Sequence, residues 1–326
     1  MPSVVCFGEA LVDLLAEPSE DPAAPQRFVR YAGGAPANVA VAVARLGTPA
    51  AFVGMLAEDA FGEFLLQSLE TAGVSTQYIA RTGAAPTALA LVSLDANGER
   101  QFSFYRPPAA DLLFRPEHFQ DACFQDAALF HACSNSLTEA AIAEATLEGM
   151  RRAHTAGALV SFDMNLRLNL WPAATDPRVR IWQALHTAEL VKLSAAELAF
   201  LAEPLGGEAA VCDKLWRGRA QWVWVTDADA PIRHFTRSGT GTQPAFAVRS
   251  VNATAAGDAF VGGMLSWLAR EGVNASNLGE LLQERVRMLA AMRFACACGA
   301  LAVTRHGAFD AMPTLAEVQR FLDAQP

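Results

Sequence analysis

The stretch 250-SVNATAAGDAF-260 places a run of small residues and one carboxylate, Asp258, directly before an apolar helical pattern. Small side chains let backbone N–H groups converge on an anion, and the amino end of a helix adds about half a positive charge. An aspartate in that place lies beside a bound phosphate, where it can take the proton of an attacking hydroxyl. The stretch is therefore typical of phosphoryl transfer to an alcohol. From this segment alone, Asp258 as a simple helix cap is an equally good interpretation.

The composition is that of a folded globular protein. Of the 326 residues, 52% are hydrophobic and 18% are charged. This length is enough for one large α/β domain with an appendage, or for two ordinary domains. The formal charge of −9 argues against a non-specific nucleic-acid binder, because such proteins neutralise many phosphates with clustered Lys and Arg. An anionic substrate remains compatible with it, since a local site can be positive on an acidic protein.

Nothing in the sequence predicts a membrane or metal-cluster protein. The start of the chain, MPSVVC, lacks the basic region and apolar core of a secretory signal, and the apolar stretches fall short of the ~20 residues that span a bilayer. We therefore expect a cytoplasmic protein with no membrane partner. The six cysteines lack paired zinc-type spacing and are interpreted as reduced core thiols. The six histidines form no H-E-x-x-H arrangement, which gives a transition-metal site little support.

Buried-strand patterns alternate with helical patterns over most of the chain. The strand patterns are short apolar runs at 4–7, 50–53, 129–132, 159–162, 190–193 and 222–225. The helical patterns lie at 38–46, 61–72, 139–156, 195–201, 258–270 and 281–302. This alternation predicts an α/β fold of three layers, α/β/α, in which helices cover both faces of a mainly parallel central sheet.

Two segments interrupt this alternation with patterns of antiparallel strands. These patterns cover 11–16, 28–31, 87–94 and 100–105. The second pair is joined by 95-DANG-98, and an Asn-Gly turn between β-rich runs is a strong hairpin signal. Because these strands fall between units of the main sheet, we expect a small separate β-sheet, a lid, formed by approximately 11–31 and 87–106. An antiparallel extension of the main sheet is the alternative that the sequence leaves open.

Two polar clusters lie where open α/β sheets bind ligands. In 31-YAGGAPAN-38, adjacent glycines allow close backbone approach, and the Asn38 amide can both donate and accept, which suits a polyol. The cluster 162-FDMNLR-167 follows a buried strand, and ligands in such folds bind beyond the carboxyl ends of the strands. A glycine turn with an Asn cap and a solvated loop are the alternatives.

Taken together, the motifs resemble the ribokinase-like, or PfkB, family of carbohydrate kinases, and within it the bacterial fructokinases. The resemblance runs nearly end to end. Its motifs are 8-GEALVD-13, 33-GGAPANVA-40, 104-FYR-106, 110-AD-111, 163-DMNLR-167 and 256-AGD-258. It implies a single ribokinase-like kinase domain over 1–326 with the lid strands inserted into it. ATP would lie over the edge of the sheet, and the sugar would bind between sheet and lid.

The resemblance also implies a role for each matched residue. The sugar would be held by Asp13, Gly33, Gly34, Asn38, Phe104, Arg106, Asn165 and Arg167. Asp258 would be the general base, and the backbone N–H groups of Ala255, Ala256 and Gly257 would form the anion hole. The nucleotide would lie near Lys192, Ser194, Thr226, Ala228, Gly257 and Cys296. Glu197 would organise Mg²⁺ through water.

Three places depart from the family pattern. The usual D-T-T-G-A-G-D appears as 252-NATAAGD-258, in which the alanine at 255 is a mild change if its φ is negative. Asn252 replaces the first acid, which leaves a monovalent cation such as K⁺ an open question. The usual T-x-G-x-x-G loop appears as 226-TDADAP-231, and the adenine-side Asn of the late helix appears as Cys296. The ATP affinity is therefore also open.

The expected activity is transfer of the γ-phosphoryl group of Mg-ATP to a hydroxyl of fructose. A 2-keto-3-deoxygluconate-type kinase is the alternative within the family, and its carboxylated sugar would need an extra cation, for which Arg106 or Arg167 could serve. A second alternative is that the protein is not an active enzyme but a sugar-binding relative with weakened turnover. A dinucleotide-dependent oxidoreductase is disfavoured because no G-x-G-x-x-G follows the first strand. The edges of the lid strands predict a homodimer through the lid.

Overall fold

The computed structural model describes residues 3–17, 25–94, 100–125 and 127–325. Its main sheet has the strand order β13-β12-β11-β10-β9-β8-β1-β4-β5. The strands are β1 (Ser3–Phe7), β4 (Ala50–Ala57), β5 (Ile79–Thr82), β8 (Ala127–Cys133), β9 (Leu159–Asp163), β10 (Leu190–Ser194), β11 (Trp222–Thr226), β12 (Ile232–Thr236) and β13 (Gly239–Gln243). Pairing is parallel from β5 through β11 and antiparallel for β12 and β13.

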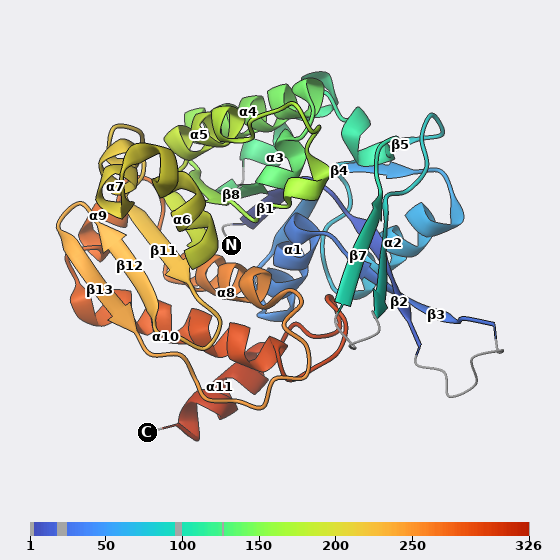
Figure 1. Cartoon of the computed structure of the whole chain (residues 1–326). Helices are drawn as coiled ribbons and strands as arrows, with labels where there is room; N and C mark the ends of the chain where they lie inside the picture. Colours follow the sequence, from blue (N-terminus) through green and yellow to red (C-terminus); the bar gives the residue numbers. More distant parts are fainter. Residues whose placement is uncertain (1–2, 18–24, 95–99, 126, 326) are drawn as a thin grey trace.

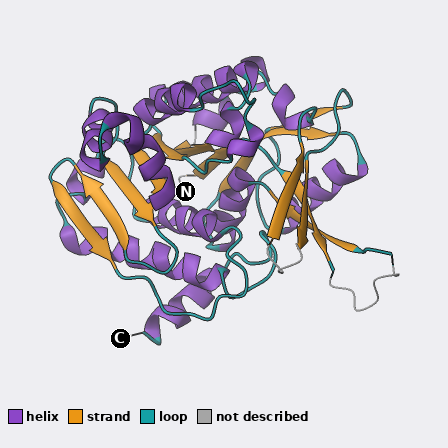
Figure 2. Ribbon diagram, viewed as in Figure 1, coloured by secondary structure: helices purple, strands orange, loops and turns teal. Residues whose placement is uncertain are grey.

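Helices cover both faces of this sheet (Figure 2). One face carries α1 (Ala35–Arg45), α2 (Ala60–Thr71), α8 (Ala256–Arg270), α9 (Leu278–Leu281) and α10 (Arg285–Ala302), and α11 (Leu315–Asp323) packs near α10. The other face carries α3 (Ala122–Gln125), α4 (Ala140–Thr155), α5 (Arg178–Thr187), α6 (Ala195–Ala202) and α7 (Glu208–Trp216). Short 3₁₀ turns are η1 (Ala110–Leu113), η2 (Pro116–His118), η3 (Ser134–Leu137), η4 (Leu168–Leu170) and η5 (Glu203–Leu205). The predicted three-layer α/β/α fold is confirmed.

The period of two along each strand explains the two hydrophobic cores. On β1, Val4 and Cys6 belong to the cluster under α1, α8 and α10, whereas Val5 and Phe7 belong to the cluster under α4 to α7. Because both faces are covered, most residues of such a strand are apolar, and a nearly continuous apolar run is the expected pattern. The six predicted strands of the parallel sheet are confirmed for this reason.

A second sheet with the order β3-β2-β6-β7 stands apart from the main one, at the right of Figure 1. Its strands are β2 (Leu11–Ala16), β3 (Phe28–Gly33), β6 (Leu89–Leu94) and β7 (Arg100–Tyr105). The separate lid is therefore confirmed over the alternative of an extended main sheet. The two hairpins are antiparallel as expected, but β2 and β6 join them in parallel. The predicted Asn-Gly turn at 95–98 lies outside the described residues.

The prediction of one continuous helix over 281–302 is wrong. The segment divides into α9 and α10, because Glu284 leaves the helical region with φ −91° and ψ 80°. The strands β5, β12 and β13 and the helices α5, α7 and α11 were not predicted from the sequence. Within the part of the chain that the structure describes, no helix combines the length and apolarity needed to cross a bilayer.

Two adjacent glycines let α8 lie between α1 and α10. A methyl group added at Gly262 would stand 2.4 Å from Cβ of Ala42 on α1, and one added at Gly263 would stand 2.7 Å from Sγ of Cys298 on α10. These contacts leave no room for a side chain, so the three helices pack at their closest approach. This packing fixes the amino end of α8 beside that of α1, where the predicted base and the predicted sugar-binding amide lie.

Candidate active site

A cavity of about 610 Å³ lies where the lid meets the carboxyl ends of β1, β9 and β10 and the amino ends of α1 and α8. The predicted residues that line it are Asp13, Gly34, Asn38, Phe104, Arg106, Asn165, Arg167, Lys192, Ser194, Glu197, Ala255, Ala256, Gly257 and Asp258. Residues from positions 13 to 258 of the chain therefore meet in one place. The position agrees with the rule that open α/β sheets bind ligands at the carboxyl ends of their strands.

Asp258 lies in the first turn of α8, with 8% of its surface exposed. Asn38 Nδ2 donates a hydrogen bond to Asp258 Oδ2 (2.8 Å), which fixes the orientation of the carboxyl group. Burial raises the pKa of Asp258 above its ordinary value, while the Asn38 hydrogen bond and the charges of Lys192 and Arg167 oppose that rise. A carboxylate whose pKa is moved toward neutrality is a better proton acceptor at neutral pH than an ordinary aspartate.

The loop before α8 adopts a left-handed turn at Ala255, with φ 59° and ψ 12°. The condition under which alanine would be a mild change here, a negative φ, is therefore not met. A glycine stands at this position in the family pattern, and an alanine pays a steric cost of about 1 kcal/mol for a left-handed backbone. Ala255, Ala256 and Gly257 line the cavity at this turn, and the Ala256 amide donates a long hydrogen bond (3.4 Å) to the Ala253 carbonyl.

A buried ion pair lies beneath this turn. Lys192 Nζ is 3.0 Å from Asp163 Oδ1, and both side chains are less than a tenth exposed. A methyl group at Gly257 would stand 3.1 Å from Lys192 Nζ, so the ammonium group touches the backbone of the predicted anion hole. Burial raises the pKa of Asp163 to about 7, against the opposing charge of Lys192. The positive charge of the ammonium group adds to that of the helix end.

Glu197 is held by two backbone amides in a capping box at the start of α6. Ser194 N donates to Glu197 Oε2 (2.6 Å), and Leu166 N donates to Glu197 Oε1 (2.7 Å). Glu197 lines the cavity, and each oxygen of an ionised carboxylate can accept more than one hydrogen bond. The group can therefore bind the water molecules that Mg²⁺ retains in proteins.

The glycine pair at 33 and 34 leaves space for the carboxyl group of Asp13 and the backbone of Glu9. A methyl group at Gly33 would stand 2.7 Å from Asp13 Oδ2, so the bare backbone provides the space in which that carboxyl group lies. Gly34 has φ 104°, and a methyl group there would stand 2.5 Å from the Glu9 carbonyl oxygen. Burial, and secondarily the charge of Asp258, raise the pKa of Asp13 to about 6.

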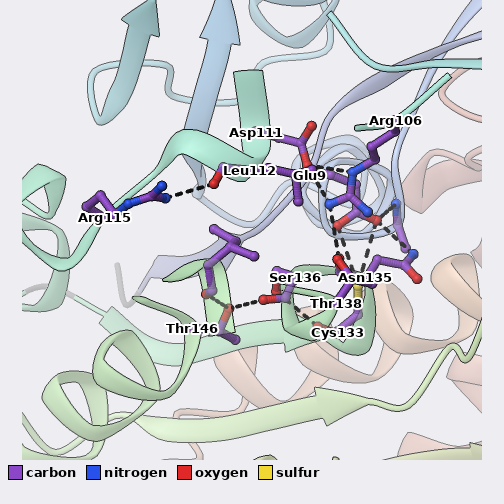
Figure 3. A network of polar contacts seen from close by, with 12 residues as sticks. Glu9, Arg106, Asp111, Leu112, Arg115, Cys133, Asn135, Ser136, Thr138 and Thr146 are labelled. Carbon is purple, nitrogen blue, oxygen red and sulfur yellow. Dashed lines mark hydrogen bonds and ion pairs between the residues drawn. The ribbon is translucent and has the colours of Figure 1, made fainter. Parts of the chain in front are cut away.

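A network of buried polar groups closes the lid end of the cavity (Figure 3). Arg106 donates through Nε (2.8 Å) and Nη2 to Asp111 Oδ2, and through Nη2 to the Asn135 carbonyl (3.0 Å). Asn135 Nδ2 donates to Glu9 Oε1 (3.0 Å), and the amide of Ala35 donates to the same oxygen (3.3 Å). The network ties the end of lid strand β7 to the ends of β1 and β8.

Four of the predicted residues do not line the cavity. Gly33 lies next to Asp13, Thr226 is the last residue of β11, and Ala228 follows that strand. Ala228 has a φ of 45°, again a left-handed backbone where the family pattern has glycine. Cys296 is buried on α10 within the core cluster that includes α8. Their predicted roles stay predictions.

The sequence reasoning gave no role to several residues that the fold brings to the site. These are Glu9, Asp111, Asn135, Asp163 and Asn169. Glu9, Asp111 and Asp163 stand inside motifs that carried the resemblance, so a signal for them was present. Asn135 and Asn169 lie in the 3₁₀ turns η3 and η4, which come after β8 and β9 and carry no motif, so only the arrangement of the strands places them.

Comparisons with known proteins agree with this architecture. A family model described as pfkB family carbohydrate kinase matches residues 1–315. Fructokinase-1 of Zea mays is 40% identical over 325 residues, which are 98% of this chain and 97% of the maize protein. The crystal structure of fructokinase with bound ATP from Xylella fastidiosa has a TM-score of 0.95 and 55% identity, with 98% of each chain covered. Fructokinase from Vibrio cholerae O395 in fructose, ADP and calcium ion bound form has a TM-score of 0.86 and 32% identity, with 99% of each chain covered. The likeness therefore extends over the main sheet and the lid together.

Proposed function

The chain belongs to the pfkB family of carbohydrate kinases, and on this premise we propose that it is an ATP-dependent fructokinase. The observation that carries the proposal is the meeting of Asp258, its partner Asn38 and the amino end of α8 in one cavity under the lid. Relatives that are fructokinases by name match almost the whole chain. A neutral ketose and a nucleoside triphosphate are therefore the substrates that we assign to the cavity.

In the reaction that we propose, a hydroxyl of fructose gives its proton to Asp258 as its oxygen attacks the γ-phosphorus of ATP. The bond between that phosphorus and the β-γ bridging oxygen breaks, and ADP leaves. The amides of residues 255–257 stabilise the charge that develops on the transferred group, at about 3 to 4 kcal/mol for each well-aimed donor. The Nδ2 group of Asn38 orients the carboxylate of Asp258, and its Oδ1 atom faces the sugar.

The remaining predicted residues divide between the two substrates. We assign Asp13, Gly33, Gly34, Asn38, Phe104, Arg106, Asn165 and Arg167 to the sugar, and Lys192, Ser194, Thr226, Ala228, Gly257 and Cys296 to the nucleotide. Lys192 is supported by its contact with Gly257 at the start of α8. Mg²⁺, held through water by Glu197, would neutralise charge on the nucleotide phosphates. A monovalent cation such as K⁺ stays an open question, because Asn252 replaces the first acid of the family pattern.

We further propose a single kinase domain with an inserted lid, a homodimer through that lid, and a cytoplasmic location. The dimer is supported by apolar side chains on lid strands, since Phe28 is 41% and Tyr105 is 64% exposed. The location is supported by six cysteines that are all unpaired, which is typical of a reducing compartment.

The test is a substrate panel read by ADP release. Fructose, ribose, 2-keto-3-deoxygluconate and adenosine are each supplied with Mg-ATP, and we expect fructose to give the highest kcat/KM. Preference for the sugar acid would identify the alternative kinase of the same family. No ADP release with any sugar, combined with calorimetric binding of fructose, would identify a relative with weakened turnover.

A further inference from the structure

Arg106 directly follows lid strand β7 and lines the cavity, and it is already paired with a carboxylate. Its bonds run from Nε and Nη2 to Asp111 Oδ2, and from Nη2 to the Asn135 carbonyl. Both partners of the ion pair are almost fully buried, with 2% and 3% of their side chains exposed. Arg106 lines the cavity, whereas Asp111 stands behind it and does not. Asp111 therefore acts on a ligand only through Arg106.

The charges around Arg106 leave no net positive charge for a ligand. Glu9, 1% exposed, lies on the other side of the guanidinium group and is electrostatically coupled to it (Figure 3). With Glu9 protonated, Arg106 and Asp111 sum to zero. With Glu9 ionised, the three groups sum to −1. Either state is unfavourable for a carboxylate ligand, because an anion is bound in a buried site only when opposite charge compensates its lost hydration.

Other charged groups of the cavity do not reverse this balance. Lys192 is paired with Asp163 at the opposite, phosphate-binding end. Arg167 is exposed, and its Nη1 donates to the neighbouring Leu166 carbonyl. Asp13 and Asp258 add carboxyl groups close to the sugar-binding side. At the buried lid end, a carboxylated sugar would therefore lose hydration without gaining a guanidinium group whose charge is not already compensated.

We propose that Asp111 is a specificity residue, which pairs with Arg106 and so withholds that guanidinium from carboxylated sugars, restricting the site to uncharged ones. The inference rests on the proposed function and narrows its substrate class to neutral sugars. A site discriminates between ligands through the charges that it leaves uncompensated in the wrong ligand, as well as through its contacts with the right one. Among the described residues, Nη1 of Arg106 has no hydrogen-bond acceptor, so it can donate to a neutral hydroxyl oxygen and the pair still serves an uncharged ketose.

The test compares kcat/KM for 2-keto-3-deoxygluconate with kcat/KM for fructose in the unaltered enzyme and in Asp111→Asn. Removal of one negative charge beside Arg106 should raise this ratio by about 10-fold or more, because a unit charge at a few ångströms in a protein site is worth that much in affinity. Adding Arg106→Gln to the variant should abolish the gain. A folded Asp111→Asn protein with an unchanged ratio overturns the inference.

Two controls keep the result interpretable. Asp121→Asn makes the same chemical change at a side chain that is 88% exposed, and it should leave the ratio unchanged. Cooperative unfolding shows that Asp111→Asn is folded. If this variant does not unfold cooperatively, the test uses inhibition of the unaltered enzyme, in which the sugar acid and its uncharged amide are compared as competitors of fructose. The inhibition constant of the amide should be lower than that of the acid by about 10-fold or more. Equal inhibition constants overturn the inference. Failure of the unaltered enzyme to phosphorylate fructose counts against the proposed function instead.

Discussion

Asp258 combines burial, one strong hydrogen bond and a position at the start of α8, which is why we assign the proton transfer to it. Asp258→Asn keeps the size of the side chain and removes its capacity to take a proton. We expect kcat to fall by roughly 100-fold to 10,000-fold, the range typical of a lost general base. Calorimetric binding of fructose should remain, and near-normal turnover would reject the assignment.

Asn38 tests the same site from the sugar side. Its amide nitrogen holds Asp258, and its Oδ1 is a buried acceptor that has no donor among the described residues, which a sugar hydroxyl could supply. Asn38→Ala should raise the KM for fructose much more than the KM for ATP. Equal rises in the two values would contradict the placement.

The pH dependence of Asn38→Ala provides an independent measurement. The Asn38 hydrogen bond stabilises the ionised form of Asp258 and so lowers its pKa, against the rise caused by burial. Loss of that bond raises the pKa further. Because the base works only when ionised, kcat/KM falls as the pH drops through this pKa, and the acid limb of the profile should move to higher pH in the variant. An acid limb that does not move would mean that another group controls it.

At the scale of elements, the packing of α8 between α1 and α10 places the base. Gly262→Ala would bring a methyl group to 2.4 Å from Cβ of Ala42, which has no flexible side chain to move aside. We expect a loss of about 1 to 3 kcal/mol in the free energy of unfolding, with a fall in kcat as Asp258 separates from Asn38. Gly279→Ala in α9 is the matched control, because no atom lies within 4 Å of its added methyl group. Equal effects of both changes would refute the packing argument.

At the left-handed turn before α8, we expect a substitution to increase the free energy of unfolding. Ala255 has φ 59°, and glycine removes the steric strain of that conformation at some cost in the entropy of the unfolded chain. Ala255→Gly should therefore raise the free energy of unfolding by about 0.5 to 1 kcal/mol. Ala196→Gly, at an exposed position in α6, should lower it by a similar amount. Denaturant unfolding measures both, and destabilisation by Ala255→Gly would show that the turn carries no strain.

How far the sequence predicted these elements depended on what surrounds each one. Strands buried on both faces, such as 222–225 with the sequence WVWV, are continuous apolar runs and were found. The edge strand β13 reads GTGTQ, because an edge needs no apolar run, and it was missed. Residues in motifs, such as Asn38 and Asp258, were placed correctly in one cavity. The pairing of Arg106 with Asp111 and of Lys192 with Asp163 was not predicted, since it follows from side-chain packing between distant segments.

At the scale of the whole molecule, both sheets contribute residues to the cavity. The main sheet brings the ends of β1, β9 and β10 to the cavity, and the lid adds Leu11 and Asp13 from β2 and Phe104 from β7. The lid is joined to the rest of the chain at Arg106 through buried hydrogen bonds. A change in how the lid is held would therefore reach the sugar end of the cavity first.

The exposed apolar side chains of the lid lead to the last prediction, which concerns assembly. Phe28 is 41% exposed on β3 and Tyr105 is 64% exposed on β7, the two outer strands of the lid. Outer strands of a sheet with apolar side chains are sites of association, so we expect a homodimer by light scattering. Phe28→Glu combined with Tyr105→Glu should give a monomer, because each new charge would be buried without a partner in the interface. Val286→Glu, at a side chain that is 82% exposed on α10, should leave the dimer intact. A monomer before any substitution, or a dimer that only Val286→Glu disrupts, would place the interface elsewhere or remove it.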